Sequence, residues 1–169
     1  MLFVVKLIEV LAFRLAGYAG LRVGEVRGLR WRDVNLQTGH ITIRQAVCRG
    51  QEAPPKSGHQ RRIPLVLELV EELRKVGPGR RDDFVSLSER GKPWTEHGLL
   101  NAFRRACKRA GLAGWSFHSL RHYFVTALFR AGVGAPTVRE LAGHLHLSTT
   151  QRYAHTTEEE LEEAIRKLR

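Results

Sequence analysis

Residues that could act on an anion are concentrated between positions 118 and 155, where five of the histidines lie. His118 and Arg121 are three residues apart at the start of a predicted helix, so their side chains are neighbours on its surface, with His122 beside them. An imidazole and a planar guanidinium near a helix N-terminus suit phosphate oxygens. A solvated polar face on a basic protein is the alternative, and the spacing alone leaves both interpretations open.

A tyrosine further along this region is a candidate nucleophile. Tyr153 lies in a polar segment, nine residues after His144, and a tyrosine among basic groups can attack phosphorus. A surface tyrosine whose ring packs on its own domain is the alternative. The spacing of His118 and His122 also fits a metal, but neither glutamate nor cysteine accompanies them and the nearby arginines would repel a cation, so we expect no metal.

Two more segments each place one basic residue in a turn or loop that contains glycine or proline. Arg22 lies between Gly20 and Gly24, and Glu25 follows three residues after it. Lys56 follows two prolines in a loop over residues 50–60. Taken alone, these could equally be a structural turn and a solvated lysine.

The elements that must position these residues follow from periodicity and from caps. The sequence predicts an α+β fold, mostly helical, with a small three-stranded antiparallel sheet. The expected helices cover residues 2–16, 65–76, 95–110, 118–131, 136–143 and 157–168, a short helical turn covers 148–153, and the expected strands cover 40–47, 61–64 and 84–87.

Composition restricts the class of protein. A chain of 169 residues makes one domain with a core. Arginine accounts for most of a net charge of +11, which is typical of proteins that bind nucleic acid. The longest uncharged run is too short to span a membrane, and two cysteines form no disulfide framework, so we expect a cytoplasmic protein with no membrane partner.

Five segments in order resemble the tyrosine recombinases of the phage integrase type. The order Arg, Lys, His-x-x-Arg, His, Tyr is that of the family, and the resemblance extends over residues 11–163. The segments are AGLRVGEV (19–26) with LRWRDV (29–34), PKSG (55–58), RRIPL (61–65), HSLRHYFVT (118–126), and LAGH (141–144) followed by YAH (153–155).

The resemblance implies a reaction and a role for each matching residue. Tyr153 would attack a DNA phosphate, leaving a 3′-phosphotyrosyl link and a free 5′-hydroxyl, with no cofactor. Arg22 and Arg121 would clamp the phosphate oxygens, and His144 would donate a hydrogen bond to them. Lys56 would be the general acid and His118 the base or orienting group.

Further expectations concern supporting residues and binding. Glu25 would orient His118 or an arginine. Double-stranded DNA is the expected partner, bound by a tetramer of protomers that are monomeric when free. Six arginines are expected to contact the DNA backbone: Arg27, Arg30, Arg32, Arg104, Arg105 and Arg109. For the last three, which share one predicted helix with Lys108, a solvated basic face is the alternative.

The predicted domain organisation is a catalytic domain over residues 1–155 followed by a C-terminal helix over 156–169. The helix carries an apolar stripe (Leu161, Ala164, Ile165 and Leu168) that would fold back or dock onto a neighbouring protomer. The DNA-clamping domain that precedes this unit in the family is expected to be absent. The loop before Lys56 favours an integrase of a mobile element over the Xer branch. The alternative functions are a tyrosine-type topoisomerase and a non-catalytic DNA-binding module.

Overall fold

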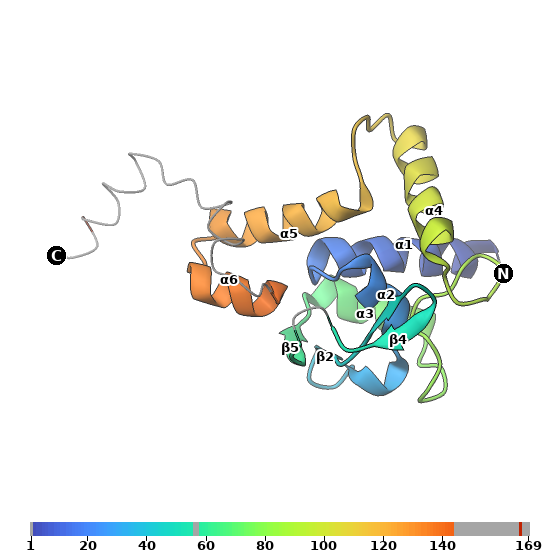
Figure 1. Ribbon diagram of the computed structural model, residues 1–169, viewed down its shortest axis with the longest axis horizontal. Helices are drawn as coiled ribbons and strands as arrows, with labels where there is room; N and C mark the ends of the chain where they lie inside the picture. Colours follow the sequence, from blue (N-terminus) through green and yellow to red (C-terminus); the bar gives the residue numbers. More distant parts are fainter. Residues whose placement is uncertain (1, 56–57, 144–165, 167–169) are drawn as a thin grey trace.

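The computed structural model describes residues 2–55, 58–143 and 166, and is shown in Figure 1. The predicted helical segments 148–153 and 157–168 lie outside the described residues, except for Arg166. The helices are α1 (Leu2–Tyr18), α2 (Val23–Gly28), α3 (Leu67–Val76), α4 (Glu96–Arg109), α5 (Phe117–Arg130) and α6 (Ala135–Ala142), with a short 3-10 turn at Trp31–Asp33. The strands are β1 (Val34–Asn35), β2 (His40–Ile43), β3 (Ala46–Cys48), β4 (Gln51–Ala53) and β5 (Arg61–Pro64).

A three-stranded antiparallel sheet has the order β1-β2-β5, which confirms the predicted α+β class. Its third strand, however, is β1, not the predicted segment 84–87, which makes only isolated bridges. The reason is a tight turn after β1, where the Asn35 Oδ1 atom accepts hydrogen bonds from the backbone of Gln37 and Thr38. This turn returns the chain directly into β2.

The predicted strand over residues 40–47 is also wrong in its second half. The chain leaves the sheet after Ile43, and β3 pairs with β4 in a separate two-stranded hairpin. Gln45 explains the break, because its Nε2 atom donates to the Gly28 carbonyl at the end of α2, 3.0 Å away. The hairpin is therefore held against α2, ahead of the loop that carries Lys56.

The helix predictions from residue 65 to residue 143 are confirmed to within about two residues at each end. Thr95 caps α4 by accepting a hydrogen bond from the Gly98 backbone at 3.0 Å. Gly143, with φ of 64°, ends α6 in the left-handed conformation that glycine adopts without strain.

The core joins the helices to the inner face of the sheet. Phe13, Phe103 and Phe117, from α1, α4 and α5, pack edge to face with centroids 5.2 to 6.2 Å apart. A second apolar cluster, which includes Phe124 and Val138, joins α6 to α5, and the two helices lie side by side in Figure 1. No helix in the described part of the chain has the length and apolar character needed to cross a membrane.

Candidate active site

The site begins at the tight turn between α1 and α2. Gly20 has φ of +66°, and a Cβ atom there would lie 2.4 Å from the Phe124 ring of α5. Only glycine allows this approach. Two residues later, the turn places Arg22 at the N-terminus of α2, beside α5.

Glu25 is the acidic centre of the site and is 1% exposed. Its Oε2 atom accepts the Arg22 backbone N–H at 2.8 Å, and its Oε1 atom accepts from the Arg22 guanidinium at 3.0 Å. Arg61 of β5 binds the same carboxylate with both terminal nitrogens, at 2.9 and 2.7 Å. Two roles were predicted for Glu25, orienting His118 or an arginine. In the structure it binds two arginines.

Burial by itself would raise the pKa of the Glu25 carboxyl. The hydrogen bonds and positive charges of Arg61 and Arg22 outweigh burial, so the pKa is lowered. Glu25 is accordingly an anion at neutral pH and remains a strong acceptor for both guanidinium groups.

Arg121 reaches the site from the opposite side, from α5. It is 3% exposed, so the alternative of a solvated polar face is wrong for this residue. Its guanidinium donates to the Gly20 carbonyl and to the Ala142 carbonyl.

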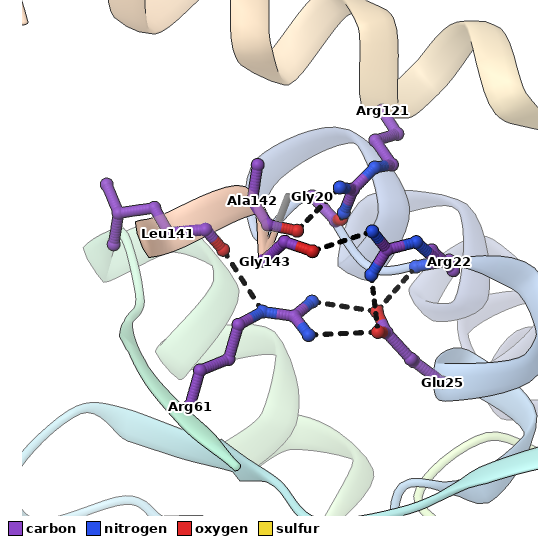
Figure 2. Close-up of polar contacts among 8 residues, drawn as sticks. All are labelled: Gly20, Arg22, Glu25, Arg61, Arg121, Leu141, Ala142 and Gly143. Atoms are coloured by element: carbon purple, nitrogen blue, oxygen red, sulfur yellow. Dashed lines mark hydrogen bonds and ion pairs between the residues drawn. The ribbon is translucent and has the colours of Figure 1, made fainter. Parts of the chain in front are cut away.

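Three arginines converge on the C-terminal end of α6, as Figure 2 shows. The last carbonyls of a helix lack partners within the helix and carry partial negative charge. Arg61 Nε donates to the carbonyl of Leu141 at 3.2 Å, Arg121 donates to that of Ala142, and Arg22 donates to that of Gly143 at 2.7 Å. The end of α6 is thus fixed by arginines from three separate elements.

The first histidine of the site lies on the edge of this cluster. The rings of His118 and His122 meet edge to face with centroids 4.5 Å apart. Partial burial lowers the pKa of His118, and the positive charges of His122, Arg121 and Arg22 lower it further. A neutral imidazole, which can accept a proton, is therefore favoured near neutral pH.

The arrangement suits a tetrahedral oxyanion. Three guanidinium groups and one carboxylate leave an excess of positive charge, and the side chain of Arg22 keeps 24% of its surface exposed. A guanidinium presents its donors in a planar fork that matches phosphate oxygens. Lys56, His144 and Tyr153 lie outside the described residues, although His144 follows Gly143 directly in the chain.

The six arginines predicted to bind the DNA backbone fall into two groups. Arg104, Arg105 and Arg109 are exposed on the outer face of α4, together with Lys108. Arg30 instead packs its guanidinium 4.2 Å from the centre of the Phe84 ring and pairs with Glu52, while Arg32 pairs with Asp82.

Of these six arginines, Arg27 is the most buried. It is 6% exposed and donates to the carbonyls of Trp94 and Val47 at 3.0 and 3.1 Å. Its partners belong to segments remote in the sequence, which the local pattern did not reveal. These surroundings do not support the predicted contact of Arg27 with the DNA backbone.

Sequence reasoning did not select Arg61 as a site residue. A signal was present in β5, where Arg61 and Ile63 alternate with the exposed Arg62 and Pro64. This alternation places Arg61 on the inner face of the sheet. A charged residue at an inward position requires a buried partner, and that partner is Glu25.

The fold and this arginine cluster define the class of protein. The chain belongs to the phage integrase family, whose model matches residues 5–160. Tyrosine recombinase XerD of Listeria innocua is 35% identical over an alignment of 159 positions, which covers 88% of this chain and 50% of that protein. The chain spans about half the length of the curated relatives it matches.

Solved structures show the same fold. The Tn1549 transposon integrase, in complex with transposon right end DNA, superimposes with a TM-score of 0.82 over 95% of this chain and 58% of its own, at 22% identity. The XerH site-specific recombinase, bound to its difH substrate, gives a TM-score of 0.71 at 26% identity over 98% of this chain and 48% of its own.

Proposed function

We propose that this chain is the DNA-cleaving and rejoining unit of a site-specific tyrosine recombinase. The observation that carries the proposal is the convergence of Arg22 and Arg121, from α2 and α5, on adjacent carbonyls at the end of α6. In a member of this family, that convergence supports a phosphate-binding role for both guanidinium groups, next to the segment that leads to His144 and Tyr153.

The proposed reaction is phosphoryl transfer without a metal. The Tyr153 hydroxyl attacks the scissile phosphorus, the bond to the 5′-oxygen breaks, and a 3′-phosphotyrosyl link forms. Negative charge grows on the non-bridging oxygens, where Arg22 and Arg121 stabilise it. The energy of the phosphodiester is retained in the link, so a 5′-hydroxyl of a partner strand can reverse the step.

Proton transfers are assigned to three further residues. His118, held neutral by its surroundings, accepts or orients the Tyr153 proton. Lys56 protonates the leaving 5′-oxygen, and His144 donates a hydrogen bond to the phosphate. The assignments of Lys56, His144 and Tyr153 are supported by the match between their segments and the family motifs.

Double-stranded DNA is the proposed substrate. The net charge of +11 and the exposed basic face of α4 supply electrostatic affinity for its backbone. We further propose that protomers assemble as a tetramer on DNA, and that residues 156–169 form a helix that docks its apolar stripe onto a neighbouring protomer. Deleting residues 161–169 should then reduce protomer association more than DNA binding, whereas unchanged association and recombination would contradict this role.

The decisive experiment is the capture of a covalent adduct. The full chain is incubated with labelled nicked duplexes that carry a randomised central segment, in parallel reactions with a chelator and with Mg²⁺, and SDS-stable protein–DNA adducts are isolated. The wild-type chain should form adducts and Tyr153→Phe should form none, while both bind DNA with similar affinity. An adduct in Tyr153→Phe, or a strict requirement for a divalent metal, would contradict the mechanism.

Two alternative functions give different results in the same assay. A non-catalytic DNA-binding module would form no adduct. A tyrosine-type topoisomerase would form adducts and relax supercoiled plasmid without joining strands from two different duplexes. The test is therefore completed with two labelled duplexes whose sequences are recovered from the adducts. Strand exchange between them supports a recombinase, and its absence together with plasmid relaxation supports a topoisomerase.

A further inference from the structure

Two adjacent arginines of β5 have opposite surroundings. In the pairing of β2 with β5, Arg61 is opposite Ile43 on the inner face, and Arg62 is opposite Thr42 on the outer face. The side chain of Arg61 is 4% exposed, whereas Arg62 is exposed and makes one long contact, 3.4 Å, to the Thr38 hydroxyl. The strand thus provides both a buried arginine and a matched exposed control.

The Arg61 guanidinium joins two parts of the site. Its two terminal nitrogens bind both oxygens of Glu25, and its Nε atom binds the Leu141 carbonyl. It also lies directly against the backbone of Gly143, where an added Cβ atom would come within 2.9 Å of it. Figure 2 shows this guanidinium between the Glu25 carboxylate and the end of α6.

Arg22 depends on the same two parts. Its backbone and guanidinium are held by Glu25, and its Nη2 atom is held by the Gly143 carbonyl. Within the described residues, each partner of the Arg22 N–H and guanidinium is therefore also bound by Arg61 or lies directly against it. A displacement of Arg61 must move the carboxylate, the end of α6, or both.

We infer that Arg61 is a positioning residue for phosphate cleavage: by fixing Glu25 and the last turn of α6, it sets the orientation in which Arg22 meets the scissile phosphate. The inference rests on the proposed function and adds a residue that does not itself contact DNA. Misplacement of a phosphate-binding group by about 1 Å can lower a reaction rate by about 100-fold. Arg61 should therefore influence the rate of cleavage much more than the affinity for DNA.

The kinetic test uses the full chain and the nicked duplex pool under single-turnover conditions. Arg61→Met retains length and loses charge and donors, Arg61→Lys retains charge without the fork, and Arg62→Met is the control. The rate constant of adduct formation should fall by about 100-fold in Arg61→Met and by less in Arg61→Lys. Arg62→Met should match the wild type, and DNA affinity should change little in all three.

The final amount of adduct separates positioning from folding. A lower amount at an unchanged rate constant would mean that Arg61 only stabilises the fold, and would overturn the inference. An unchanged rate constant in a folded variant would overturn it as well. If Arg61→Met fails to fold, Arg61→Lys carries the test, since a wild-type rate constant in that variant also contradicts a requirement for the fork.

A crystal structure of the Arg61 variant tests the geometry without DNA or activity. Loss of the contact between Arg22 Nη2 and the Gly143 carbonyl supports the inference, and retention of the wild-type geometry around Arg22 overturns it. This result also separates the two proposals. A wild-type chain that forms no adduct contradicts the proposed function, whereas an unchanged Arg22 contradicts only the role of Arg61.

Discussion

The arginines at the end of α6 and those on the outer face of α4 carry the same charge in very different surroundings. Arg22, Arg61 and Arg121 are held by a buried carboxylate and by helix carbonyls. Arg104 is exposed and donates to Asn101 within its own helix, and Arg105 is exposed as well. Fixed guanidinium groups act at one position, whereas exposed ones provide attraction along a whole surface.

The largest expected effect is a loss of stability when the Glu25 carboxylate, which holds the buried arginines, is removed. Glu25→Ala leaves two arginines without their buried partner, which should reduce the free energy of unfolding by about 3–5 kcal/mol. The ion pair between Asp82 and Arg32, whose side chains are 70% and 36% exposed, supplies the control. Asp82→Ala should cost no more than about 1 kcal/mol in urea denaturation, and equal losses in the two variants would remove the distinction.

The second test replaces arginine by lysine at one position in each region. Arg121→Lys keeps the charge but loses the planar fork, and should lower the rate constant of adduct formation by about 100- to 1,000-fold. Arg104→Lys should leave that rate constant within about twofold, since a backbone contact needs only charge. Single-turnover adduct formation measures both, and a large effect at Arg104 would show that α4 takes part in the chemistry.

A third test sharpens the role of α4 as an affinity surface. Replacing Arg104, Arg105 and Arg109 together by Gln should weaken the salt dependence of DNA binding. The slope of the logarithm of the association constant against the logarithm of the salt concentration should become shallower by roughly 3 if each arginine neutralises one phosphate. Fluorescence anisotropy between about 50 and 200 mM salt measures this slope. The rate constant at saturating DNA should not change, and a fall there would contradict a purely electrostatic role.

The smallest expected effect concerns proton binding at His118. Burial and three positive neighbours lower the pKa of His118, so NMR titration should give a value below 6.5. His122→Ala removes one of these charges and should raise it. Since the folded state disfavours the protonated ring, stability should be complete above about pH 6.5 and should decrease as the pH falls below it. A pKa above 6.5 would contradict this electrostatic account.

The sequence predicted those parts of the molecule that depend on neighbouring residues. Thr95 and Gly143 defined helix ends, and the helix that carries Arg121 was correctly placed. β1 was missed because a two-residue strand is defined only by its partner β2, and no local pattern reports that pairing. Strand boundaries depend in this way on long-range contacts more than helix boundaries do.

The same limit applied within the site. Arg61 was recognised only as part of a motif, because its partner Glu25 is 36 residues earlier and belongs to another element. Arg27 was taken for a DNA contact because its sequence neighbours give no sign of the Trp94 and Val47 carbonyls that hold it. Charge can be counted from a sequence, but burial of charge depends on the fold.

Gly24 and Gly28 of α2 allow the backbone of the β3–β4 hairpin, which leads toward Lys56, to approach the helix closely. A Cβ atom on Gly24 would lie 2.9 Å from the Val47 carbonyl, and one on Gly28 would lie 3.2 Å from the Ala46 Cα atom. The hairpin is therefore seated on α2 largely through its own backbone. The outward side chains of the hairpin can therefore change without disturbing this contact, whereas a methyl group added at Gly24 would require the backbone of the hairpin to shift.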